Sequence, residues 1–166
     1  MRPISLSLAF LVSCIFCPMT AAQDTLWTRT YGGDGYDYAE SIEQTADGGY
    51  IIAGYGSSSA VGSWDVDLIK TDWKGDTLWT QSYGDIGTDV ATCVIQTLDG
   101  GYAVSMPEGI GNLLRVDAAG DSLWVRHYGI RAHAVLETAD GGFMLAGQRD
   151  EHCCLLRTDS AGHLDW

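Results

Sequence analysis

The sequence predicts an all-β protein built from a repeated unit of short strands. Glycine is abundant and proline is rare, with 21 glycines and 3 prolines in 166 residues, which indicates many tight turns. No useful length of the chain has the apolar spacing of an amphipathic helix. Three landmarks recur in the same order three times, and internal repetition of this kind sets the reading of the whole fold.

The first landmark is a tryptophan followed four residues later by Tyr-Gly, the second is an Asp-Gly-Gly turn, and the third is a Leu-x-Lys/Arg-x-Asp segment. The tryptophans are Trp27, Trp79 and Trp124, and the turn aspartates are Asp47, Asp99 and Asp140. The third landmark reads Leu68-Ile-Lys-Thr-Asp72, Leu113-Leu-Arg-Val-Asp117 and Leu155-Leu-Arg-Thr-Asp159. A repeat region over residues 23–166 therefore contains three units, at about 27–78, 79–123 and 124–165.

Each unit predicts four short strands. In the first unit, strand 39–45 ends at Asp47-Gly48-Gly49, a strong hairpin signal because glycine tolerates the positive φ of a tight turn. Strands at 50–55 and 67–71 follow, and a turn at 72–75 leads to the fourth strand at 77–83. Units of this length with four strands are typical of propeller blades. We therefore expect β-propeller-type repeats with about three four-stranded blades.

The repeated residues predict structural roles. A four-stranded blade cannot bury both faces alone, so we expect Trp27, Trp79 and Trp124 to supply contacts between neighbouring blades. The aspartates that recur in every unit at the Asp-Gly-Gly turns favour a turn role over catalysis.

These landmarks resemble exported bacterial and archaeal β-propeller repeat proteins, whose units read W-x-x-x-Y-G-G, Q-T-x-D-G-G-Y-I-I-A-G and K-T-D-x-x-G-D. The resemblance extends from Asp24 to Trp166 and includes the delta-60 and seven-bladed propeller repeats. A looser resemblance links Lys70-Thr-Asp72-Trp-Lys-Gly75-Asp-Thr-Leu-Trp79 to the tryptophan-docking motif of quinoprotein propellers. It concerns the docking of blades and brings no quinone-binding residue. The family resemblance implies a surface or secreted module.

The N-terminal residues predict export. Residues 1–22 have a basic start, a short apolar stretch and small residues at 20–22, which is typical of a secretory signal peptide. The alternative is a lipoprotein signal with a lipidated Cys14, because Leu11-Val12-Ser13-Cys14 resembles a lipobox. The apolar stretch is too short to span a membrane. A formal charge of −13 argues against nucleic-acid partners, whose phosphates would be repelled.

The sequence predicts no catalytic residue, no cofactor site and no metal site. The acidic segments do not fit the calcium loop of an EF-hand, and no zinc-type spacing of Cys and His occurs. Cys93, Cys153 and Cys154 do not form a disulfide framework, since their number is odd. Variable loops on a rigid scaffold are where binding usually evolves. The candidate ligand-binding residues are Asp34, Tyr36, Asp37, Tyr55, Trp64, Asp65, Asp85 and Asp89. The alternative is that the aspartates are solvated loop positions and that the aromatic residues close the blade edge.

These patterns favour an exported, non-enzymatic module with a binding or structural role at or outside the cell surface, its partner a glycan or a protein. The alternative is a carbohydrate-active (endoglucanase-like) or quinoprotein-like enzyme, or an accessory part of one. Residues 24–31 are expected to form a fourth-type strand without a blade of their own, and the final fourth-type strand begins at Trp166. We therefore expect an incomplete propeller, continued either by further C-terminal blades or by self-association.

Overall fold

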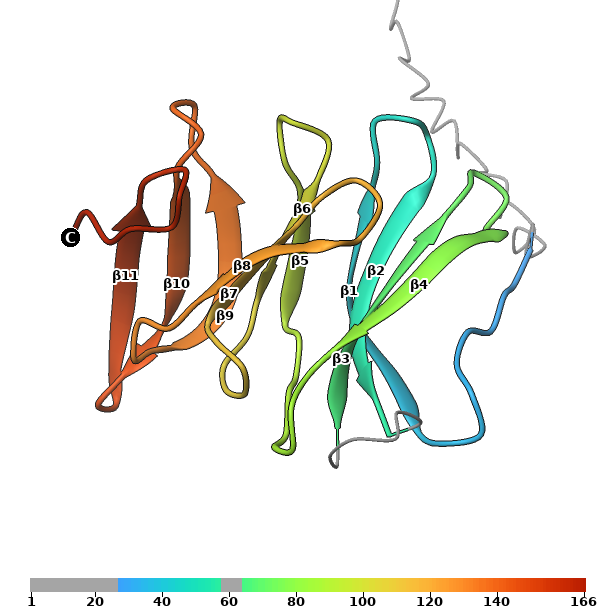
Figure 1. The fold of residues 1–166 in the computed structure, drawn as a ribbon, viewed down its shortest axis with the longest axis horizontal. Coiled ribbons are helices and arrows are strands. Elements are labelled where there is room, and N and C mark those ends of the chain that lie inside the picture. Colours follow the sequence, from blue (N-terminus) through green and yellow to red (C-terminus); the bar gives the residue numbers. More distant parts are fainter. Residues whose placement is uncertain (1–26, 58–63) are drawn as a thin grey trace, which may run out of the picture.

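The computed structural model describes residues 27–57 and 64–166, which form three antiparallel sheets and contain no helix (Figure 1). The predicted signal peptide and Cys14 lie outside the described residues. Sheet 1 contains β1 (Asp37–Gln44), β2 (Tyr50–Gly56), β3 (Asp65–Thr71) and β4 (Thr77–Tyr83). Sheet 2 contains β5 (Cys93–Gln96), β6 (Tyr102–Ser105), β7 (Leu113–Val116) and β8 (Ser122–Arg126). Sheet 3 contains β9 (Arg131–Glu137), β10 (Phe143–Arg149) and β11 (His152–Thr158).

The Asp-Gly-Gly segments form the predicted hairpin turns. In the β1–β2 turn the Thr45 amide donates to the Gly49 carbonyl at 2.9 Å, and Gly48 has a φ of +82°. Equivalent hydrogen bonds close the turns at 97–101 and 138–142. The strand order within each sheet follows the chain, as expected for successive hairpins.

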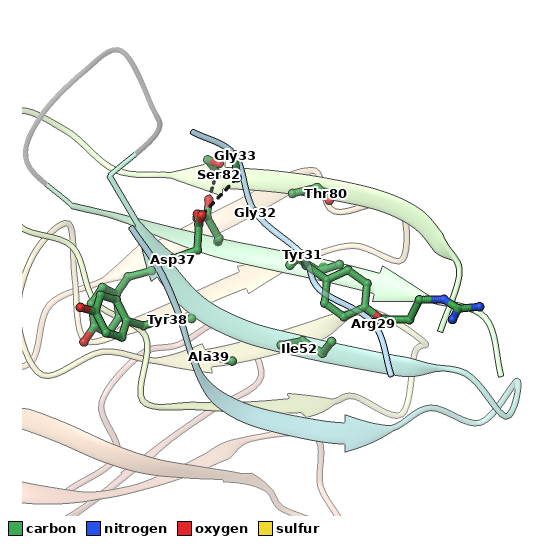
Figure 2. Close-up of a pocket in the computed structure, with 14 residues that line it drawn as sticks. Arg29, Tyr31, Gly32, Gly33, Asp37, Tyr38, Ala39, Ile52, Thr80 and Ser82 are labelled. Atoms are coloured by element: carbon green, nitrogen blue, oxygen red, sulfur yellow. Dashed lines mark hydrogen bonds between the residues drawn. The ribbon is translucent and has the colours of Figure 1, made fainter. Parts of the chain in front are cut away.

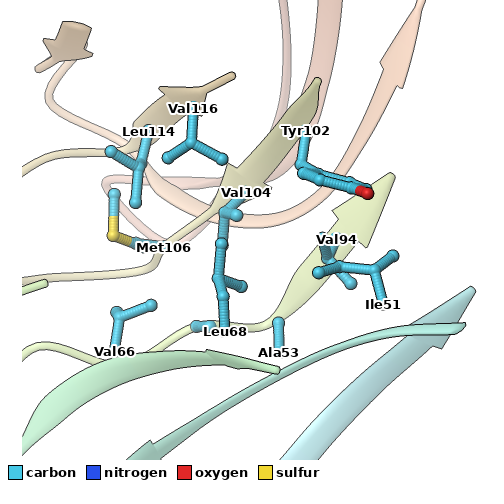
Figure 3. Close-up of a cluster of buried hydrophobic side chains, with 11 residues drawn as sticks. Ile51, Ala53, Val66, Leu68, Val94, Tyr102, Val104, Met106, Leu114 and Val116 are labelled. Atoms are coloured by element: carbon cyan, nitrogen blue, oxygen red, sulfur yellow. The ribbon is translucent and has the colours of Figure 1, made fainter. Parts of the chain in front are cut away.

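The sheets stack face to face in chain order, with a separate apolar core between each neighbouring pair (Figure 1). The core between sheets 1 and 2 is shown in Figure 3. It combines side chains of β2 and β3 with side chains from sheet 2, and its fully buried members include Ile51, Leu68, Val104 and Leu114. The core between sheets 2 and 3 is built around Leu113, Phe143, Leu145 and Leu156. The first strands of neighbouring sheets also contact one another, β1 with β5 and β5 with β9.

The periodic tryptophan and tyrosine connect each sheet to the next one, at a contact we call the seam. Trp79 of β4 packs edge-on against Tyr102 of β6, with ring centroids 5.8 Å apart. The Tyr83 hydroxyl, in the same strand, donates to the carbonyl of Gly120 in the β7–β8 turn. Trp124 and Tyr128 make the same contacts with Phe143 of β10 and with the carbonyl of Gly162 in the turn after β11.

Residues 27–31 occupy the same place on sheet 1. Trp27 contacts Tyr50, with ring centroids 6.3 Å apart, and the Tyr31 hydroxyl donates to the Gly75 carbonyl at 2.8 Å. The described part of this segment is not a paired strand, so the prediction of a fourth-type strand here is wrong for residues 27–31. Its backbone lies beside no strand among the described residues, because the sheet it would extend is not present there.

The three sheets form an open stack, and no closed barrel or propeller is found among the described residues. Residues 164–166 add to the edge of sheet 3, where Leu164 bridges to Thr158 and the Trp166 carbonyl accepts from the Arg157 amide at 3.1 Å. Within residues 27–57 and 64–166, no helix is long and apolar enough to cross a membrane.

Candidate functional site

The recurring turn aspartates are held by a cation from the third strand of the same sheet. Lys70 Nζ lies 2.8 Å from Asp47, and Arg115 binds both oxygens of Asp99 at 2.6 Å. Both cations are almost completely buried. The hydrogen bond from Lys70 is the largest of the effects that hold the pKa of Asp47 well below its usual range.

The third member of this series is more open to solvent. Arg157 pairs with Asp140, but about a third of its side chain is exposed. All three aspartates also accept hydrogen bonds from a threonine hydroxyl and a glycine amide of their own turn. The geometry assigns these residues to the scaffold. The sequence signal for the cation was available, because Lys or Arg stands at the same place in each third landmark.

The predicted ligand-binding residues lie at the opposite end of the sheets from these turns. Asp34 and Tyr36 are exposed in the segment before β1, Asp37 begins β1, and Tyr55 and Asp65 flank the β2–β3 connection. Asp85 and Asp89 lie between β4 and β5, with Asp89 fully buried. The structure places five of these residues, Tyr55, Trp64, Asp37, Asp65 and Asp89, in an aromatic cluster and two pairs of carboxylates. Asp34, Tyr36 and Asp85 lie outside these groups.

The aromatic cluster consists of Tyr38, Tyr55 and Trp64. Tyr38 and Tyr55 are cross-strand partners and stack with ring centroids 5.1 Å apart. The Trp64 ring lies 5.7 Å from Tyr38 and 5.5 Å from Tyr55, tilted against the first and edge-on to the second. Tyr38 is half exposed, so the cluster presents an aromatic surface to solvent. Tyr36, which is 72 % exposed, has no ring contact within this cluster.

The first carboxylate pair, Asp37 and Asp67, borders a hollow of about 450 Å³ on the outer face of sheet 1 (Figure 2). An oxygen of each lies 2.5–2.6 Å from where a Cβ on Gly56 would stand, so the two groups are close neighbours. The Gly33 amide donates to Asp37 at 3.1 Å, and the Ser82 hydroxyl donates to Asp67. Burial is the main cause that raises the pKa of Asp67, with a smaller contribution from Asp37.

The second pair, Asp65 and Asp89, is buried. Oxygens of both lie within 2.1–3.0 Å of where a Cβ on Gly84 would stand. Asp89 accepts from the amides of Asp85 and Ile110, whereas Asp65 Oδ1 has no hydrogen-bond partner among the described residues. Burial, followed by the charge of Asp89, raises the pKa of Asp65. Ionisation of Asp65 is therefore less favourable than that of an exposed aspartate.

Sequence reasoning missed two members of these groups. Tyr38 was not singled out because an exposed tyrosine in a strand carries no sequence signal until its cross-strand partner is known. Asp67 was not among the predicted residues; alternation along β3 places it on the same face as Asp65, although the two aspartates join different pairs.

The described residues hold no group of three or more His, Cys, Asp and Glu side chains that is arranged to bind a metal ion. Cys93, Cys153 and Cys154 are free thiols. Comparison with known proteins finds no matching family model and no significantly similar curated protein.

Proposed function

We propose that the three sheets are blades of a β-propeller-type module that is exported and binds a ligand rather than transforming one. The support for the architecture is the repetition of the seam, in which a tryptophan and a tyrosine of one sheet pack on the next. The pattern of short hairpins with contacts between the first strands of neighbouring sheets is typical of blades around an axis.

The observation that carries the binding function is the aromatic cluster of Tyr38, Tyr55 and Trp64. Tyr38 is half exposed and its two partners are partly buried, and aromatic rings of this kind combine a large apolar face with polar atoms, which suits contact with the apolar face of a sugar ring. Burial is the main cause that raises the pKa of Tyr55, and a hydrogen bond with Glu40 adds to it, so an acceptor for sugar hydroxyls lies beside the rings.

The charge of the chain narrows the ligand class. A net charge of −13 repels polyanions, including sulfated and uronic-acid-rich glycans. We therefore propose a neutral glycan as the ligand, bound at the loop end of sheet 1.

Binding to an array of neutral and acidic glycans, followed by titration of the best neutral glycan against tryptophan fluorescence, tests the proposal. We expect Tyr38→Ala to abolish binding and Tyr36→Ala to leave it unchanged, since Tyr36 lies outside the ring contacts. The proposal fails if no neutral glycan binds, or if both substitutions weaken binding equally.

The enzyme alternative and the cellular location are tested separately. Release of reducing sugars from a panel of polysaccharides would support a carbohydrate-active enzyme, especially if Asp67→Asn abolished it. N-terminal sequencing of exported protein tests the signal peptide, because we expect a start near Gln23 and a lipidated Cys14 would contradict it.

A further inference from the structure

Two neighbouring sheets of the chain pack through two different faces. The outer face of sheet 1 has the residue pattern of one of these faces, and the outer face of sheet 3 has the pattern of the other. We infer that two copies of this chain associate through these faces, with sheet 3 of one copy packed on sheet 1 of the other. The inference does not depend on glycan binding. Tyr38 and Tyr55 border the hollow, but alternation along β2 points Tyr55 to the opposite face from Ile52, so the glycan and the second copy contact different faces.

The outer face of sheet 1 has the same pattern as the covered face of sheet 2. By repeat position, Ile52 and Ile69 correspond to Val104 and Leu114. The two residues of sheet 2 are fully buried against sheet 1, whereas Ile52 and Ile69 line the hollow and are only partly buried. The hollow is thus the place where another sheet would pack.

The outer face of sheet 3 has the complementary pattern. Leu155 corresponds by repeat position to Leu68 and Leu113, which are both fully buried against the following sheet. Leu155 itself is 53 % exposed, and Leu136 on β9 is exposed to the same degree. At Leu155, sheet 3 therefore presents to solvent the leucine that sheets 1 and 2 bury, and Leu136 extends the apolar surface on the same face.

The segment at residues 27–31 completes this fit. It already places Trp27 and Tyr31 on sheet 1, as β4 places Trp79 and Tyr83 on sheet 2. Residues 27–31 thus take the place of the fourth strand of a sheet packed over the hollow, and the other three strands of such a sheet are not found among the described residues of the same chain. Sheet 3 of a second copy has three strands and would supply them.

The backbone of residues 27–31 then becomes the fourth strand beside β11 of the other copy. Arg115 pairs with Trp124 inside the chain, and the same register places Arg157 opposite the partner's Trp27. The backbone hydrogen bonds that Arg157 makes with Asp165 and Trp166 are exchanged for those to the new strand.

Association of this kind is heterologous, so it either closes into a ring or continues as a filament. The described residues of each copy supply three sheets, and closed propellers contain about four to eight. Two copies are within this range and three copies exceed it. We therefore expect a closed dimer.

Disulfide trapping tests the register directly. Asp67 faces Ser82 across β3 and β4, and the equivalent positions across the copies are Cys154 and Thr30. With Cys14, Cys17 and Cys153 replaced by serine, Thr30→Cys should give a disulfide-linked dimer on a non-reducing gel. The matched control Thr28→Cys should not, because residue 28 lies opposite Leu156 in this register. Equal crosslinking of both variants, or of neither, would overturn the proposal.

Light scattering of the unmodified chain should give twice the chain mass. Leu155→Glu should yield a folded monomer, whereas Leu98→Glu, an exposed turn position on neither face, should leave the dimer intact. A wild-type monomer at all concentrations, or a dimer that resists Leu155→Glu, would contradict the inference. Leu155→Glu lies on sheet 3, away from the aromatic cluster, and should retain glycan binding, so failure of glycan binding and failure of association are separate results.

Discussion

The ion pairs under the Asp-Gly-Gly turns predict an unequal response to removing one charge. In Asp99→Asn the side chain keeps an oxygen for the turn hydrogen bonds but loses its charge. Arg115, whose side chain is 6 % exposed, then keeps neutral acceptors in the Tyr102 and Val116 carbonyls and the amide oxygen of residue 99, but it loses its counter-charge. In Asp140→Asn the remaining Arg157 is 35 % exposed, so water can solvate it.

The expected magnitudes follow from this difference in burial. Breaking a fully buried pair costs about 3–5 kcal/mol, but Asp99 itself is largely exposed and the loss is smaller. We expect Asp99→Asn to lower the free energy of unfolding by about 1–3 kcal/mol, and Asp140→Asn by about 0–1 kcal/mol, as for exposed pairs.

Urea unfolding monitored by tryptophan fluorescence at pH 7 measures both variants. The turn hydrogen bonds and Arg115 lower the pKa of Asp99, so its contribution is present above the pKa of the unfolded chain. It is lost as the pH falls through the lower folded value, and the difference between wild type and Asp99→Asn should shrink in strong acid. Equal losses for the two variants, or a larger loss for Asp140→Asn, would refute the argument from burial.

Three further substitutions probe the seam and the buried carboxylate. In urea unfolding, Trp79→Ala should lower the free energy of unfolding by about 2–4 kcal/mol, somewhat less than the loss of a fully buried aromatic side chain. Trp73→Ala, at an exposed turn, should lower it little. Similar small effects of both substitutions would contradict the seam. Tyr128→Phe removes only the hydroxyl bonded to the Gly162 carbonyl and should cost about 1 kcal/mol in the same assay; an unchanged midpoint would mean that this bond contributes nothing. Asp65→Asn should raise the melting temperature at pH 7. The pKa of Asp65 is raised in the folded protein, so its ionisation destabilises the fold as the pH rises above the pKa of the unfolded chain. Scanning calorimetry should show the gain disappear near pH 3, and a lower melting temperature at pH 7 would contradict the prediction.

The elements that repeat were predictable from the sequence, because three copies of each landmark reveal position and role together. The strand predicted at 77–83 coincides with β4, and the predicted strand at 50–55 lies within β2. The hairpin turns followed from Asp-Gly-Gly alone, since few other sequences provide the required backbone geometry.

The groups at the loop end were less accessible from the sequence because they do not repeat. Asp65 and Asp89 are separated along the chain and meet only through the connection after β4. Tyr38 joins Tyr55 through the register of β1 with β2, which is disturbed between Ala39 and Ser41. A bulge of this kind changes which side chains share a face, and no local sequence signal marked it here.

The seam has a consequence for how the chain unfolds. The tryptophan and tyrosine that follow the third strand of one sheet pack on the next sheet along the chain. Each packed unit therefore combines residues from two consecutive sheets. No described sheet is stabilised by its own residues alone. Unfolding of one sheet removes the tryptophan and tyrosine that cover the next sheet along the chain. In an array coupled between nearest neighbours, the member clamped on both faces has the greatest protection. Sheet 2 holds that position among the described sheets, and its amides should therefore be the slowest to exchange with solvent.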